Sequence, residues 1–181
     1  MVLAVHNDRG MSQLRFREIQ RFRQPWVWCL LLVTNFWLIG IFGYGLVQQL
    51  IKGEQWGSNP MSDMGLVVTT VLMVVFSLGM LWLFLTMSLQ VEVRSDALYV
   101  HFKYWKRQTI QYGDIASVEA CQYRPILQYG GWGIRRRRNG WAFNVSGNKG
   151  VRLTFHEGKH LMIGSQRYTE LAAAIEAERA R

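Results

Sequence analysis

Charged residues and cysteines are scarce in this chain of 181 residues. Charged residues make up 18% of the sequence, below the roughly 25% of soluble domains. The two cysteines, Cys29 and Cys121, stand far apart and form neither a C-x-x-C pair nor a metal-ligand spacing. A cysteine-based zinc site or dithiol redox motif is therefore excluded. The glycine-rich motifs of nucleotide-binding loops, G-x-x-x-x-G-K-[ST] and G-x-G-x-x-G, are absent from the sequence as well.

Two long stretches contain no charge at all. No charged residue lies between Arg23 and Lys52, or between Asp63 and Glu92. Both stretches exceed the roughly 20 residues that an α-helix needs to cross a hydrocarbon core, whereas a buried helix of a small soluble domain is shorter and carries a polar stripe. The sequence predicts a first transmembrane helix, a short extracytoplasmic loop and a second transmembrane helix: residues 25–51, 52–63 and 64–89.

Positive charge gives the expected orientation of these helices. Five arginines precede the first helix: Arg9, Arg15, Arg17, Arg21 and Arg23. The connecting loop holds Lys52 against Glu54 and Asp63, and four cations soon follow the second helix. Because an excess of Lys and Arg marks the cytoplasmic side, we expect a multi-pass protein of the inner or an internal membrane with both termini in the cytoplasm.

Residues 1–24 form a basic cytoplasmic segment in this interpretation. Leu14, Phe16, Ile19 and Phe22 lie among the arginines. Their spacing is compatible with a short amphipathic helix on the inner leaflet. A solvated, positively charged flank is the alternative that the residues leave open.

Residues 90–181 change from helical to alternating periodicity. Seven runs bounded by Gly, Asp, Asn or Ser predict short β-strands: residues 89–94, 98–104, 108–112, 116–123, 141–146, 151–157 and 161–165. Residues 167–180 follow as an amphipathic helix with Leu171 and Ile175 on one face. Seven antiparallel strands can form two packed sheets, four strands and then three, whose open corner the helix would close. The expected fold is a membrane α-helical hairpin plus a mainly-β sandwich or partly open barrel capped by a C-terminal helix.

Four short motifs carry a resemblance to a known family: YRP at Tyr123–Pro125, YGGWGIR at Tyr129–Arg135, NVSGNKGVRL at Asn144–Leu153 and LMIGSQR at Leu161–Arg167. Over roughly residues 26–176 the chain resembles the small bacterial membrane proteins that combine two N-terminal transmembrane helices with a cytoplasmic pleckstrin-homology-like domain. The resemblance implies an architecture rather than an activity.

The segment Tyr129–Trp141 is the strongest candidate binding site. Four adjacent arginines repel each other and need water, phosphate or carboxylate around them. The preceding glycines allow positive φ and can present N–H groups to an anion, and tryptophan faces accept guanidinium stacking. We predict a site for an anionic headgroup or an acidic partner: Gly130, Gly131, Trp132, Gly133, Arg135, Arg136, Arg137 and Arg138. A merely solvated basic loop is the open alternative.

The sequence HEGKH at His156–His160 matches the zinc-protease pattern H-E-x-x-H. That pattern works on a helix, where both histidines face one metal. Gly158 and the alternating residues before it predict a hairpin turn instead, with the two histidines facing each other across it. We expect no metal, no cofactor and no enzymatic activity.

These observations favour a non-catalytic, membrane-anchored scaffold or assembly module that binds a membrane protein partner, the anionic headgroups of membrane lipids, or both. The lack of a recognition helix or an RNA-binding aromatic pattern argues against nucleic acid. The alternative is an accessory or regulatory subunit of a membrane transport or energy-converting complex. Neither predicted helix contains an ionisable residue, which argues against an ion path of its own.

Overall fold

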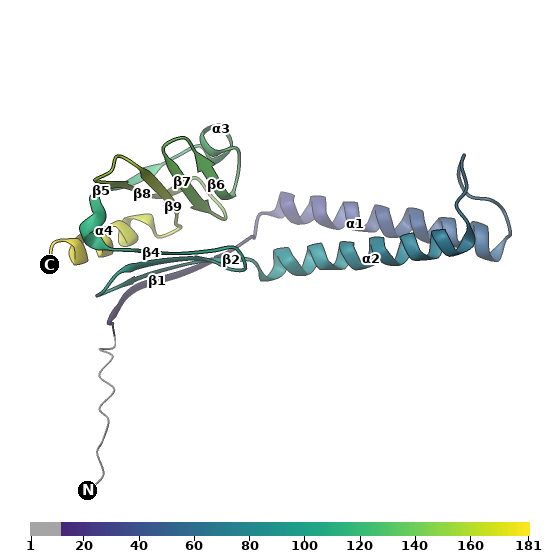
Figure 1. Cartoon of the computed structure of the whole chain (residues 1–181), viewed down its shortest axis with the longest axis horizontal. Helices are drawn as coiled ribbons and strands as arrows, with labels where there is room; N and C mark the ends of the chain where they lie inside the picture. Colours follow the sequence, from purple (N-terminus) through teal and green to yellow (C-terminus); the bar gives the residue numbers. More distant parts are fainter. Residues whose placement is uncertain (1–11) are drawn as a thin grey trace, which may run out of the picture. The chain divides into compact units, whose positions relative to one another are not determined.

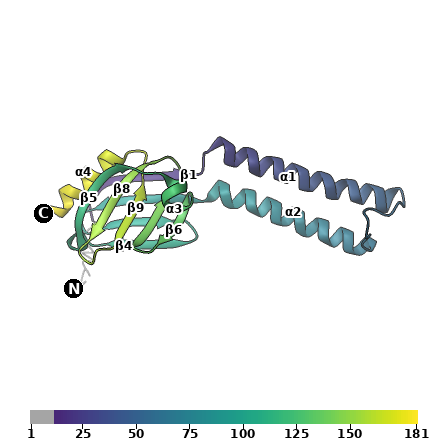
Figure 2. The same ribbon diagram turned by 90° about the horizontal axis from the view of Figure 1, so that it is seen from above.

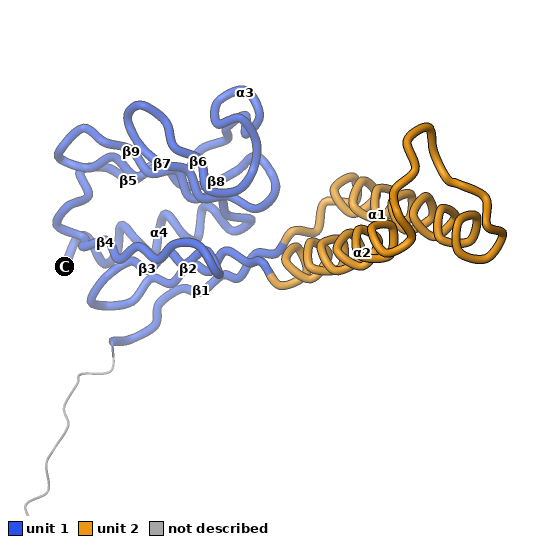
Figure 3. Tube along the Cα trace, turned by 45° about the vertical axis from the view of Figure 1, so that its right-hand side comes forward, with its two compact units in different colours: residues 1–21, 87–181 blue, residues 22–86 orange. Residues whose placement is uncertain are grey.

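The computed structural model describes residues 12–181, so the first part of the predicted basic segment, including Arg9, lies outside the described residues. The chain divides into two compact units (Figure 3). One unit, the helical hairpin, consists of Phe22–Thr86. The other, the β unit, combines the residues up to Arg21 with Met87–Arg181.

The helical hairpin contains two long apolar helices (Figure 1). Helix α1, Pro25–Leu46, continues into a π-helical stretch η1, Val47–Ile51, and α2 spans Asp63–Thr86. Pro25 occupies the first turn of α1, where its missing N–H costs no hydrogen bond. Both helices are long and apolar enough to cross a membrane. The two predicted helices are thus present, except that α2 ends three residues before position 89.

Polar side chains lie between the two helices, whereas large apolar side chains cover their outside. The buried Ser77 hydroxyl donates to Asn35 Oδ1, and Asn35 Nδ2 donates to the carbonyl of Leu31 at 2.6 Å. Phe36 and Phe76 are 80% and 62% exposed. A water-soluble helix pair would show the opposite distribution.

The β unit begins with an antiparallel sheet in the order β1-β2-β3-β4. Its strands are β1 Leu14–Arg21, β2 Ser88–Arg94, β3 Leu98–Phe102 and β4 Lys106–Ile110. Strands β1 and β2 are direct neighbours with Arg21 opposite Ser88. The helical hairpin is therefore inserted between two adjacent strands of one sheet.

The amphipathic helix considered for the N-terminal segment is wrong, because Leu14–Arg21 is a strand. Its inward residues alternate as Phe16, Glu18 and Gln20. Glu18 accepts hydrogen bonds from Ser165 Oγ at 2.5 Å and from the N–H of Gln166 at 2.9 Å. Gln20 Nε2 donates 2.7 Å to the carbonyl of Gly164. Polar side chains thus hold the strand against the rest of the β unit.

The second sheet has the order β5-β8-β9-β7-β6. Its strands are β5 Ile115–Gln122, β6 Gly133–Arg137, β7 Gly140–Asn144, β8 Lys149–Phe155 and β9 His160–Gly164. All seven predicted strands are present, and β1 and β6 are additional. The expected division into four strands and then three antiparallel strands is wrong. The chain crosses between the sheets one strand earlier, at the 3-10 turn η2, Tyr112–Asp114, and β7 pairs with β9 in parallel.

The two sheets pack against a C-terminal helix, α4, Tyr168–Arg179 (Figure 1). Helix α4 contacts β5 and β8 of one sheet and β1 and β2 of the other, which confirms the expected closing role. Its Leu171 and Ile175 are fully buried. Seen from above, β8 and β9 run obliquely across the strands of the first sheet (Figure 2). The buried core of the β unit includes Phe102, Phe143 and Leu153.

Candidate functional site

The arginine run lies on a strand at the edge of the second sheet rather than in a free loop. The predicted loop contains a short helix, α3, Pro125–Tyr129, then a glycine turn and then β6. Strand β5 ends at Gln122, and Pro125 starts α3 because proline suits the first turn of a helix. Arg138 and Asn139 form the tight turn from β6 into β7.

The three glycines adopt the positive φ values that the sequence predicts. Gly130, Gly131 and Gly133 have φ of 73°, 117° and 109°. The first two N–H groups donate to the carbonyls of Ile126 and Pro125 and close α3. The third donates 2.9 Å to Asn144 Oδ1. These three N–H groups are therefore used within the chain, and the expected anion-binding concavity is not formed by them.

A buried hydrogen-bond chain fixes the start of β6. Asn144, which is fully buried, accepts from Gly133 and donates through Nδ2 to the hydroxyl of Tyr123 at 3.0 Å. The Tyr123 ring packs edge-to-face on Tyr129 of α3, 5.7 Å between centroids. Burial raises the pKa of Tyr123 to about 12 and also raises that of Tyr129. Both phenols therefore remain protonated and neutral at physiological pH.

Trp132 closes the glycine turn. Its indole Nε1 donates to the carbonyl of Gly147 at 2.9 Å, which ties the turn to the β7–β8 connection. The carbonyl of Trp132 accepts a hydrogen bond from Arg135 Nε at 3.2 Å. Trp132 thus holds the segment that precedes the arginines.

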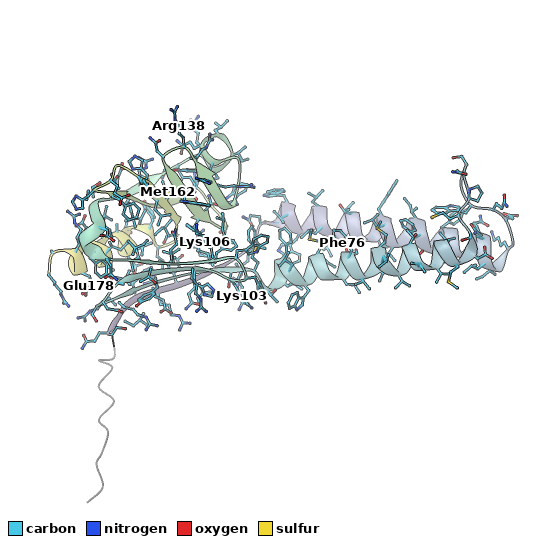
Figure 4. The ribbon with its side chains drawn as sticks, in the orientation of Figure 1. Phe76, Lys103, Lys106, Arg138, Met162 and Glu178 are labelled. Atoms are coloured by element: carbon cyan, nitrogen blue, oxygen red, sulfur yellow. The ribbon has the colours of Figure 1, made fainter. Side chains whose placement is uncertain are left out.

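The arginines alternate between the two faces of the sheet, since successive side chains of a strand point to opposite sides. Arg135 pairs with Ala142, and Arg136 pairs with Trp141. Arg137 Nη2 donates to the carbonyl of Leu127 in α3 at 3.3 Å. The four arginines are all exposed, and Figure 4 shows Arg138 on the outside of the β unit. They therefore do not form one uniform patch.

A cleft of about 590 Å³ collects three of the four arginines. It lies between β4 of the first sheet and the β6–β7 turn and β8–β9 turn of the second. Five cationic residues line it: Arg107, Arg136, Arg137, Arg138 and Lys159. Asp114 is the one carboxylate among its described lining residues. We call this feature the basic cleft.

Trp141 forms an aromatic wall of the basic cleft. Lys106 Nζ lies 3.6 Å from the centroid of its ring, and the Arg136 guanidinium carbon lies 5.7 Å away. Both distances are within the range of a cation–π contact. The contact joins β4 to β7, so the ring orients cations from both sheets around the same space.

The outer face of the second sheet carries a smaller cavity of about 360 Å³. Tyr129, Arg137 and Arg152 line it together with His160. Arg152 also pairs with Glu119 at 3.1 Å, which leaves less uncompensated charge here than in the basic cleft.

The HEGKH motif is a hairpin turn, as predicted. Strand β8 ends before His156, and β9 begins at His160. His160 lies opposite Thr154 and 3.2 Å from its hydroxyl, so the expected facing pair of histidines is wrong. Between Ser12 and Arg181, no group of three or more His, Cys, Asp and Glu side chains is placed to hold a metal ion.

No family model matches the chain. A search of curated proteins finds no match either. The chemistry of the site therefore has to follow from its own residues.

The structure brings together part of the predicted site and adds residues to it. Arg136, Arg137 and Arg138 line the basic cleft, whereas Arg135, Trp132 and the glycines lie outside its lining. The sequence prediction missed the contributions of Lys106, Arg107 and Lys159. These three cations lie at two turns, β3–β4 and β8–β9, and the sequence shows them there. Only the packing of the two sheets places these turns beside the arginines of β6.

Proposed function

We propose that this chain is a non-catalytic, membrane-anchored module whose basic cleft binds anionic phosphate groups of lipid headgroups. The observation that carries the proposal is the cleft itself, with five cations against one carboxylate among its described lining residues. Arginine and lysine side chains are the usual protein ligands of phosphate. Nothing in this chemistry requires a reaction.

The anchoring is supported by the helical hairpin. Its exterior is apolar, and the polar residues Asn35 and Ser77 lie between its helices, which we call the polar seam. This distribution suits a hydrocarbon solvent. The ladder between β1 and β2 requires that the chain leave and re-enter the β unit at one end of the same sheet. A hairpin that spans a bilayer twice satisfies this requirement. The excess of arginine and lysine outside the connecting loop supports a cytoplasmic β unit.

The β unit supports the pleckstrin-homology-like assignment at the level of two sheets closed by a C-terminal helix. The parallel pairing of β7 with β9 and the added strands β1 and β6 depart from the expected seven-stranded arrangement. We propose a pleckstrin-homology-like module with these additions.

Electrostatics makes the attraction sufficient for a tethered module. Each basic group close to an anionic membrane surface contributes about 1 kcal/mol. Five such groups give on the order of 5 kcal/mol before screening and desolvation. Screening acts over roughly 8–10 Å, so binding through the cleft should weaken with salt.

A titration of the full chain in neutral-detergent micelles tests the proposal. Dihexanoyl phosphatidylglycerol is the probe, and dihexanoyl phosphatidylcholine is the lipid control. Calorimetry should detect salt-dependent binding of the first lipid, and the double change Arg136→Gln with Arg138→Gln should weaken it about tenfold or more, because two charges contribute about 2 kcal/mol.

The matched control is Arg167→Gln with Arg179→Gln, which removes the same charge from the two ends of α4. These arginines pair with Glu170 and Glu176 and lie outside the cleft. The control should bind phosphatidylglycerol like the wild type. Equal binding by the cleft variant and the wild type overturns the proposal.

An accessory subunit of a larger membrane complex is the second candidate. The observation in its favour is on α1, where a Cβ added at Gly40 or Gly43 would meet no other atom within 4 Å. Small residues of this kind allow another helix to approach closely. Crosslinking in native membranes, followed by purification, would recover a stoichiometric partner if this candidate is correct.

A further inference from the structure

The turn between β3 and β4 exposes two aromatic side chains. Residues Lys103–Trp105 connect the strands, and the N–H of Trp105 donates to the carbonyl of Phe102 at 3.1 Å. Tyr104 is 52% exposed and Trp105 is 66% exposed. Burial in the protein core therefore does not explain the presence of either ring.

Tyr104 also has an unusual backbone. Its φ is 71°, the one positive value at a non-glycine position in the described part of the chain. Glycine or asparagine suits this conformation better than an aromatic residue. A bulky ring held outward on a left-handed turn is a feature that points to contact with something outside the chain.

Three cations flank the two rings in the sequence. Lys103 Nζ lies 4.8 Å from the centroid of the Tyr104 ring, and Lys106 and Arg107 follow directly after Trp105. The segment therefore reads KYWKR. Tyrosine and tryptophan prefer the headgroup region of a bilayer, where the ring is shielded and the polar edge stays hydrated. Lysine and arginine beside them favour an anionic leaflet.

The turn lies at a particular end of the first sheet. The N–H of Lys103 donates 2.8 Å to the carbonyl of Ser88, and Ser88 is opposite Arg21. At Arg21 the chain leaves β1 toward α1, and at Ser88 it enters β2 after α2. Three residues separate Arg21 from Pro25, and one residue separates Thr86 from Ser88. Figure 4 shows Lys103 and Glu178 at opposite ends of the β unit.

We propose that Tyr104 and Trp105 insert into the headgroup region of the same leaflet that the helical hairpin enters. The turn then acts as a third membrane contact and restricts rotation of the β unit about its two short connections. This inference rests on the membrane anchoring in the proposed function. It does not depend on phosphate binding by the basic cleft.

Site-directed spin labelling of the full chain tests the depth of the turn. Cys29→Ala and Cys121→Ala give a cysteine-free background, and Trp105→Cys and Tyr104→Cys provide two independent labelling sites on exposed positions. The control label is Asp96→Cys, because Asp96 is exposed on the β2–β3 turn at the other end of the same sheet. The protein is placed in nanodiscs of phosphatidylcholine and phosphatidylglycerol.

Power saturation compares access of oxygen, which is enriched in lipid, with access of a water-soluble nickel chelate. The ratio of oxygen to nickel access should exceed one at positions 104 and 105 and fall below one at position 96. Equal ratios at the turn and at position 96 overturn the proposal. A lipid-like ratio at position 96 as well also overturns it, because the contact would then not be specific to this turn.

Repeating the measurement with Arg136→Gln and Arg138→Gln separates the two proposals. If this variant loses phosphatidylglycerol binding while the label at position 105 stays lipid-exposed, both proposals hold. If the wild type shows no phosphatidylglycerol binding but position 105 is lipid-exposed, the cleft proposal fails and the turn proposal stands. If the label at position 105 is water-exposed while the wild type binds phosphatidylglycerol, the turn proposal fails and the cleft proposal stands.

Discussion

The helical hairpin exposes most of its large apolar side chains, whereas the β unit buries most of its own. In the hairpin, Asn35 and Ser77 are buried, while Phe36 is 80% exposed. In the β unit, Phe143 is fully buried, while the arginines of β6 are exposed. Large apolar side chains therefore lie mostly on the outside of the hairpin and mostly in the interior of the β unit.

In the proposed membrane-anchored arrangement, this difference corresponds to two solvents, lipid around the hairpin and water around the β unit. Water drives the burial of apolar surface in the β unit. If the hairpin lies in lipid as proposed, its exterior gains nothing from water, and its helices are held together by hydrogen bonds and close packing. Substitutions that are equivalent in chemistry should consequently have different effects in the two units.

The largest expected effect is that of truncating a buried phenylalanine. Phe143→Ala should lower the free energy of unfolding of the β unit by about 3–5 kcal/mol, through lost burial and a cavity. Phe36→Ala, at an exposed position of α1, should change the stability of the hairpin by less than about 0.5 kcal/mol. Pulse proteolysis across a urea series measures the first change, and SDS unfolding in mixed micelles measures the second. Similar losses would contradict the inverted burial.

The next effect concerns a polar residue buried in the β unit. Glu18→Ala should cost about 1–3 kcal/mol, because Ser165 and the N–H of Gln166 lose their acceptor in a buried position. The matched control is Glu157→Ala on the exposed β8–β9 turn, where solvent screens the ion pair with Lys159 and its loss should have little effect. Pulse proteolysis of both variants distinguishes them, and equal costs would show that the attachment of β1 does not depend on Glu18.

A smaller effect is expected for the polar seam of the hairpin. A double-mutant cycle with Asn35→Ala and Ser77→Ala should give a coupling energy of about 0.6–1.7 kcal/mol, typical of hydrogen bonds between helices in lipid. SDS unfolding followed by circular dichroism measures each corner of the cycle. A coupling indistinguishable from zero would mean that the hairpin is held by close packing alone.

The smallest effect is confined to acid pH. Burial raises the pKa of Glu92, but hydrogen bonds from Arg94 and Gln90 and the charges of Arg94 and Arg17 bring it below its ordinary 4.5. A carboxylate with a lowered folded-state pKa contributes stability above its ordinary pKa and loses it as pH falls through the folded value. Glu92→Gln should therefore flatten the acid limb of the pH–stability curve. Urea midpoints recorded from neutral pH downward measure it, and parallel curves for both proteins would refute the assignment.

Most of the fold could be predicted because its signals are local. The two runs without charge predicted α1 and α2, and the alternation of apolar and polar residues predicted seven of the strands. Strand β1 was missed because its inward residues include Glu18 and Gln20, while Ile19 is 49% exposed. Polar residues of β1 point inward because they bond to Gly164–Gln166, which are remote in sequence. The crossing at Tyr112–Asp114 and the parallel β7–β9 pair also depend on tertiary contacts rather than on local sequence.

The candidate site could be predicted in part for the same reason. Four adjacent arginines are visible in the sequence, but their division between two faces requires the strand β6. The glycines indicated positive φ correctly, yet the acceptors of their N–H groups include Asn144, which lies on another strand. Arg107 lines the cleft, and Lys106 contacts its Trp141 wall, only because β4 at the edge of the first sheet lies beside the second sheet.

The insertion of the helical hairpin between β1 and β2 orders the events of biosynthesis. Strand β1 leaves the ribosome first, but its neighbour β2 follows only after residues 22–87 have been made. If one helix failed to cross the membrane, the two strands would end on opposite sides and the ladder could not close. Once both helices are in place, their packing brings the strand ends together and lowers the entropic cost of pairing. For a hairpin that spans the membrane as proposed, completion of the first sheet is thus a check on correct insertion, made by the chain itself.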